Sequence, residues 1–193
     1  ADWATGNRQP SARSGDKMTP LSPTALGRFG RALDVRSTPE SHSLRFDTAG
    51  NVNLARGTIE FFARVEPRPD GGVLHHYFNF TGDRGFNLAL ARRANGQGLV
   101  LSYHFNGEHK WHYYSERFIG LGQWHHYAVT WDTSDGPGKG TMAVYVDGTR
   151  MVHSTTISPF RFGLQHFYVG KDGSTHGLID ELAISDSVRY TQN

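Results

Sequence analysis

An alternation of apolar and polar residues with a period of two recurs along this chain and constrains its fold more than any other feature. Within residues 57–65, every second position from Ile59 to Val65 is apolar, and Glu60 and Arg64 fall between them. The same alternation appears in two further segments, residues 98–106 and 141–147. Because side chains alternate between the two faces of a β-strand, each segment is predicted to be a strand with one buried face.

Further short segments rich in β-branched and aromatic residues also favour strands. They comprise residues 33–36, 42–46, 73–80, 86–91, 111–117, 124–131, 151–154, 167–170 and 178–184. Turn residues separate them, and the Asp147-Gly148 pair is typical of a tight hairpin. No long stretch keeps the helical period of about 3.6 residues. The pattern predicts an all-β fold, a two-sheet antiparallel β-sandwich of the jelly-roll type.

The first 24 residues differ from the rest of the chain, because they are polar and contain three prolines. We expect residues 1–24 to form an N-terminal tail or linker, and residues 25–193 to form one sandwich domain.

Composition excludes several classes of protein. The net charge is only +2, with 20 basic and 18 acidic residues spread along the chain, so no basic block favours nucleic acid. The absence of cysteine rules out a disulfide scaffold and a thiol nucleophile. No apolar run approaches the roughly 18 residues of a membrane span.

Five segments together resemble the laminin-G-like domains of the concanavalin A-like jelly rolls. In chain order they are residues 27–35 (GRFGRALDV), 57–64 (GTIEFFAR), 124–132 (WHHYAVTWD), 144–148 (VYVDG) and 177–184 (GLIDELAI). The resemblance covers about residues 27–187 and implies two antiparallel sheets packed face to face. It implies less about activity, since this fold carries lectins, adhesion domains, hydrolases and lyases.

On this basis we expect a non-catalytic carbohydrate-binding or adhesion module that is secreted or lies at the cell surface. Its expected partner is a polysaccharide or glycan, and other domains of a larger protein are further candidate partners. A polysaccharide-degrading enzyme on the same fold, a lyase before a hydrolase, is one alternative. A structural domain that binds protein in a surface assembly is another.

Asp180 lies between apolar neighbours on a late strand, where burial of a carboxylate needs a cation or hydrogen bonds. In similar domains the matching Asp binds a structural Ca²⁺ together with backbone carbonyls from the N-terminal part of the domain. Asp34 is the candidate for a second carboxylate, because Ca²⁺ takes six to eight oxygen ligands. The alternative is that Asp180 caps a turn or pairs with an arginine.

Ligand contact is expected from side chains that alternate with core positions and so point outward. Aromatic rings stack on the apolar faces of sugars, and polar side chains bind their hydroxyl or carboxylate groups. The candidate ligand-binding residues are Glu60, Arg64, His104, Asn106, His112, Tyr114 and Tyr145. The two histidines of the Trp-His-His segment, His125 and His126, are instead interpreted as structural.

Catalysis has weaker support in the sequence. The Glu-x-Asp-x-x-Glu strand motif of retaining glycosidases on this fold is absent. A lyase needs a base and a group that neutralises charge, and a candidate set is His104, Tyr114, Arg64 and Asn106.

Overall fold

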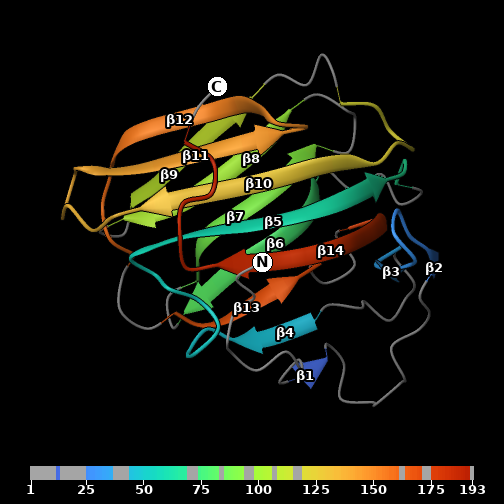
Figure 1. Cartoon of the computed structure of the whole chain (residues 1–193), viewed down its shortest axis with the longest axis horizontal. Coiled ribbons are helices and arrows are strands. Elements are labelled where there is room, and N and C mark those ends of the chain that lie inside the picture. Colours follow the sequence, from blue (N-terminus) through green and yellow to red (C-terminus); the bar gives the residue numbers. More distant parts are fainter. Residues whose placement is uncertain are drawn as a thin grey trace.

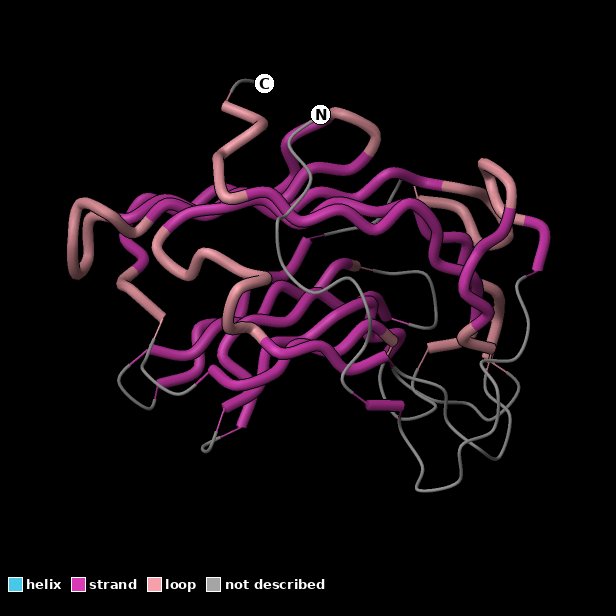
Figure 2. Tube along the Cα trace, turned by 60° about the horizontal axis from the view of Figure 1, so that its bottom comes forward, coloured by secondary structure: helices cyan, strands magenta, loops and turns pink. Residues whose placement is uncertain are grey.

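The structure is a computed structural model that describes residues 12–13, 25–36, 44–68, 74–82, 85–93, 98–105, 108–114, 119–160, 164–170 and 175–191. These ranges contain fourteen strands in two sheets, and every strand pair is antiparallel. The predicted all-β sandwich is confirmed. Figure 1 shows the two sheets one behind the other, and Figure 2 shows them as separate layers.

The first sheet contains seven strands. In spatial order they are β1 (Ala12–Arg13), β4 (Leu44–Asp47), β13 (Leu164–Val169), β6 (Leu74–Gly82), β7 (Gly85–Arg93), β8 (Leu99–Phe105) and β9 (Glu108–Tyr114). Strand β1 lies within the segment predicted to be a tail, and its two residues pair with β4.

The second sheet also contains seven strands. Their order is β12 (Thr149–Ile157), β11 (Gly140–Val146), β10 (His125–Asp132), β5 (Arg56–Val65), β14 (Gly177–Ser185), β3 (Arg31–Asp34) and β2 (Ala25–Leu26). Each segment predicted as a strand overlaps an observed one, whereas the two-residue strands β1 and β2 are too short for a periodic pattern to show.

The core lies between the sheets and is rich in aromatic residues. Phe61 of the second sheet stacks on Tyr127 with ring centroids 5.5 Å apart and contacts Tyr77 of the first sheet at 5.4 Å. The hydroxyls of Tyr77 and Tyr127 lie 3.1 Å apart, so each buried polar tip has a partner. This packing leaves the far surface of each sheet available for other contacts.

The alternation along β5 is the one that its sequence predicts. Ile59, Phe61, Ala63 and Val65 are buried in the core, and the residues between them lie on the opposite face of the second sheet. We call this opposite face the outer face of the second sheet.

Candidate functional site

The C-terminal segment, residues 186–191, crosses part of the outer face of the second sheet. The Thr58 hydroxyl donates a hydrogen bond to the carbonyl of Ser187 (2.8 Å) and accepts one from the amide of Arg189 (3.0 Å). The Tyr145 hydroxyl donates to the carbonyl of Tyr190 (3.1 Å), and the two rings lie 5.4 Å apart. Tyr145 is therefore only 2% exposed, in a small apolar cluster with Ala128 and Ala143.

Glu60 lies at the centre of a polar cluster beside this segment. Its carboxylate accepts hydrogen bonds from the Arg189 guanidinium and the Tyr190 hydroxyl, and His126 Nε2 lies 3.4 Å from its Oε2 atom. His126, together with Tyr190 and Arg189, lowers the pKa of Glu60, although burial acts in the opposite direction. Burial and the hydrogen bond to Glu60 raise the pKa of Tyr190 to about 12. Ligand binding by Glu60 and Tyr145 stays a prediction, because the C-terminal segment occupies both side chains here.

Beyond that segment, arginine and aromatic side chains gather on the rest of the outer face. We call this group the aromatic–arginine surface and define it by Arg28, Phe29, Phe62, Arg64 and Trp124. The Arg64 guanidinium lies over the Trp124 ring at 5.7 Å and donates to Glu66 Oε1 at 3.1 Å. The Arg28 guanidinium lies over Phe62 at 4.8 Å and over Phe29 at 5.5 Å.

The aromatic–arginine surface presents both apolar rings and charged groups to solvent. Phe29 is 57% exposed, which is unusual for an aromatic side chain, and it packs edge-to-face with Phe62, with the ring centroids 5.4 Å apart. The row of rings continues from Phe62 to His126 (4.9 Å) and from His126 to Tyr190 (6.1 Å). One continuous row thus runs from exposed rings to rings beside the C-terminal segment.

Asp180 fixes the position of the hairpin that carries Arg28 and Phe29. Its Oδ2 atom accepts a hydrogen bond from the amide of Phe29 (3.0 Å), and its Oδ1 atom accepts one from the amide of Glu181 (2.9 Å). Gly27 packs so closely that a Cβ atom there would lie 2.5 Å from Oδ2. The hydrogen bonds that hold this buried carboxylate match the turn-capping alternative for Asp180.

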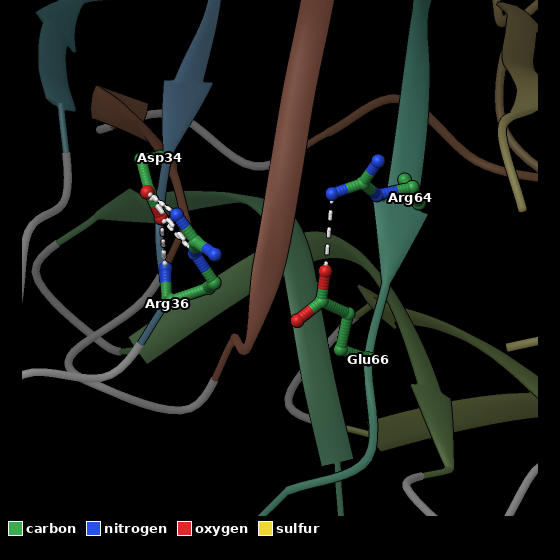
Figure 3. Close-up of polar contacts among 4 residues, drawn as sticks. All are labelled: Asp34, Arg36, Arg64 and Glu66. Carbon is green, nitrogen blue, oxygen red and sulfur yellow. Dashed lines mark hydrogen bonds and ion pairs between the residues drawn. The ribbon is translucent and has the colours of Figure 1, made fainter. Parts of the chain in front are cut away.

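Asp34, the other predicted calcium ligand, pairs with an arginine. Arg36 Nε lies 2.9 Å from its Oδ1 atom, and the Arg36 backbone amide also donates to Oδ1 at 3.0 Å. Asp34 is the cross-strand partner of Leu178, two residues before Asp180. Figure 3 shows the Asp34–Arg36 and Arg64–Glu66 pairs on opposite sides of β14.

These partners leave a poor fit for calcium between the two aspartates. Within the described parts of the chain, no three His, Cys, Asp or Glu side chains gather as metal ligands would. A calcium ion at Asp180 would depend on backbone oxygens and water, because Asp34 is held by Arg36. Calcium binding stays a prediction.

Three further predicted site residues lie on strands of the first sheet. His104 lies on β8, and His112 and Tyr114 lie on β9, where their backbones pair with Leu101 and Leu99. The structure describes the backbones of these three residues and not their side chains, and Asn106 lies outside the described residues. Since Arg64 projects from the outer face of the second sheet, the structure does not bring it together with His104 and Tyr114.

Sequence reasoning missed three members of the aromatic–arginine surface: Arg28, Phe29 and Trp124. They occur in segments whose sequence indicates the fold and carries no separate signal of a ligand site. The sequence shows that Phe62 and Arg64 share a strand face, but the hairpin and the start of β10 meet them only through long-range packing.

No helix capable of spanning a membrane is found in the described ranges. A family model described as the concanavalin A-like lectin/glucanases superfamily matches residues 38–192. No curated protein sequence matches the chain significantly.

Solved structures with the same fold are distant in sequence. Domain 4 of AbnA, an extracellular GH43 arabinanase from Geobacillus stearothermophilus solved with arabinotriose, has a TM-score of 0.58 at 21% identity, over 85% of this chain and 74% of that domain. A pentraxin from Limulus polyphemus has a TM-score of 0.51 at 17% identity, over 68% of this chain and 64% of its own. The receptor-binding domain of botulinum neurotoxin type G has a TM-score of 0.60 at 11% identity, over 90% of this chain but only 43% of its own. At these identities the likeness establishes the fold alone.

Proposed function

Because this chain belongs to the concanavalin A-like lectin/glucanases superfamily, we propose that it is an extracellular, non-catalytic carbohydrate-binding or adhesion module. In this proposal the glycan binds on the aromatic–arginine surface of the second sheet. The similar arabinanase domain was solved with an oligosaccharide and comes from an extracellular protein, which supports both the ligand class and the location.

The arrangement of Arg64, Trp124 and Glu66 carries the proposal. Trp124 is partly exposed, and an indole ring is an apolar surface on which a sugar can stack. Arg64 is oriented by Glu66 and presents hydrogen-bond donors beside that ring, while the carboxylate supplies acceptors. A platform with adjacent donors and acceptors matches the two chemical faces of a sugar, one made of C–H groups and the other of hydroxyls.

Several carboxylates of the second sheet already have protein partners, which supports binding over cleavage. Glu60 is paired with Arg189 and Tyr190, Asp34 with Arg36, and Asp180 with two backbone amides. Hydrolysis of a glycosidic bond requires two carboxyl groups that act on one substrate, and a carboxylate held by a guanidinium is poorly placed to accept a proton.

The test is a glycan array followed by titration of the best ligand against Trp124→Ala. We expect the affinity of this variant to fall about tenfold or more, because stacking and apolar burial are lost together. The control is His153→Ala, an exposed side chain on β12, an edge strand of the same sheet. If both variants bind the ligand equally well and melt like the natural chain, the ligand does not bind on this surface.

Catalysis is tested on the same polymers. We expect no new reducing ends and no absorbance from unsaturated uronic products. If the protein cleaves a polymer and loses this activity in His104→Ala or Tyr114→Phe, it is a lyase and the proposed non-catalytic role is wrong.

Calcium at Asp180 is tested by melting the protein in calcium and in chelator. If calcium binds there, it raises the melting temperature of the natural chain and has no effect on Asp180→Asn. Identical melts of the natural chain in both conditions would mean that hydrogen bonds alone hold this carboxylate.

A further inference from the structure

Among the residues that the structure describes, Arg28 has no carboxylate partner, unlike Arg64 and Arg36 on the same outer face. Arg64 pairs with Glu66, and Arg36 pairs with Asp34. In the described part of the chain, Arg28 contacts the rings of Phe62 and Phe29, and no ion pair involves it. A guanidinium held over aromatic rings still has N–H donors for another partner.

The backbone around Arg28 is held in place, which favours recognition over random contact. The amide of Gly27 donates to the carbonyl of Gly30 (2.9 Å), and the amide of Phe29 donates to Asp180 (3.0 Å). The hairpin also pairs Ala25 with Ala32. Fixing an arginine before the ligand arrives reduces the entropy lost on binding.

The charge of this hairpin favours an anionic ligand. Residues 25–36 contain three arginines, Arg28, Arg31 and Arg36, and the carboxylates of Asp34 and of Asp180, which accepts the amide of Phe29, leave a positive balance. The planar fork of arginine matches the two oxygens of a carboxylate or a sulfate, which lysine contacts only as a point charge.

We propose that Arg28, held over Phe62 and Phe29, binds the carboxylate or sulfate group of an acidic glycan. The inference rests on the proposed function and names its ligand class. Phe62 and Arg64 are two residues apart on one strand face, roughly 7 Å along β5. A single sugar chain can therefore contact Arg28 at one end of this surface and Trp124 at the other.

The experiment measures the affinity of the full chain for three soluble polymers. Polygalacturonate supplies carboxylates, dextran sulfate supplies sulfates, and dextran is neutral. The variants are Arg28→Gln, Arg28→Lys and Trp124→Ala. Arg31→Gln is the matched control, because Arg31 is exposed on the same hairpin and its loss changes the net charge equally.

We expect one acidic polymer to bind at least about tenfold more tightly than dextran. Arg28→Gln should lose roughly tenfold of that affinity, since a charge-assisted hydrogen-bonding pair is removed. Arg28→Lys should recover only part of it, and Arg31→Gln should change it less than about twofold. The acidic polymer whose affinity falls in Arg28→Gln shows whether Arg28 binds a carboxylate or a sulfate.

Two results would overturn the inference about Arg28 without contradicting the proposed function. One is a preference for acidic polymer that Arg28→Gln and Arg31→Gln reduce equally, which indicates diffuse electrostatic attraction. The other is equal affinity for dextran and the acidic polymers, lost in Trp124→Ala, which leaves the proposed glycan-binding function intact. Binding to none of the polymers would overturn the inference and count against the proposed function as well.

Discussion

His125 Nδ1 donates a hydrogen bond to Asp147 Oδ2 over 2.7 Å and so joins the start of β10 to the turn between β11 and β12. The other carboxylate oxygen of Asp147 accepts the amide of His126 at 2.9 Å, and the amide of Asp147 donates to the carbonyl of His126. The Trp-His-His and Val-Asp-Gly segments of the sequence therefore form one structural connection. This arrangement agrees with the structural role predicted for the two histidines.

Asp147→Ala should lower the free energy of unfolding by about 1–2 kcal/mol. It removes two acceptor oxygens and leaves His125, which is largely buried, without its partner. It also places alanine at a φ of 48°, a conformation that Asn and Asp tolerate better. Urea denaturation measures the change, and Asp147→Asn is the control because it keeps the turn and one acceptor. An alanine variant as stable as the natural chain would contradict the role given to this contact.

The fold could be predicted because its main signal is local. Ile59 and Phe61 are two residues apart, so the sequence alone shows that they share a face, and the structure confirms that this face is buried. The site could be predicted only in part. Thr58 bonds to Ser187 and Arg189, about 130 residues later in the chain, and no local pattern encodes that the C-terminal segment covers Tyr145.

Glu60 should make folding sensitive to acid. Its pKa is lowered in the folded state, so the unfolded chain takes up a proton first as the pH falls. The stabilisation is complete above the ordinary value near 4.5 and is lost as the pH drops through the lower folded value. We expect Glu60→Gln to reduce the slope of stability against pH below about 4.5.

The effect of Glu60→Gln should be partial, because Asp34, Asp132 and Asp147 also have lowered pKa values and so also contribute stability that is lost in acid. Denaturation midpoints at several values between pH 3 and pH 7 measure it. If the free energy of unfolding of the natural chain and of Glu60→Gln depends on pH in the same way, the contacts of Glu60 with His126 and Tyr190 do not lower its pKa in the folded state.

Gly177 should not tolerate a side chain. A Cβ atom there would lie 2.3 Å from the carbonyl oxygen of Arg64 and 2.8 Å from the Cα atom of Val65, both on the paired strand β5. Since backbone must move to admit it, Gly177→Ala should cost about 2–4 kcal/mol. The control is Gly120→Ala, where only the flexible Gln123 side chain lies in the way, at 3.3 Å. Similar thermal shifts in the two variants would contradict the close approach of β14 to β5.

The aromatic–arginine surface, like the part of the outer face that the C-terminal segment covers, could be predicted only in part. The outward direction of Arg64 follows from its alternation with Ala63 and Val65. Its contact with Trp124 depends on how β10 pairs with β5, a register that no short segment specifies. Residues on one strand face can thus be grouped from sequence, whereas residues from different strands need the sheet.

Tyr190 should stabilise the C-terminal segment through both its ring and its hydroxyl. The ring packs on Tyr145, and the hydroxyl donates to Glu60. Tyr190→Phe removes only the hydrogen bond to a charged acceptor and should cost about 1–2 kcal/mol. Tyr190→Ala also uncovers Tyr145 and should cost roughly 1–2 kcal/mol more, because an aromatic contact and its buried apolar area are lost.

The two Tyr190 variants also separate packing from electrostatics. Both lose the donor that helps to lower the pKa of Glu60, so both should show the shallower acid dependence expected of Glu60→Gln. Only Tyr190→Ala should expose the Tyr145 hydroxyl region to solvent, which hydrogen exchange at the amides of β10 and β11 can detect. If Tyr190→Ala leaves that exchange unchanged, the C-terminal segment does not depend on the ring of Tyr190, and its hydrogen bonds to Thr58 hold it in place instead.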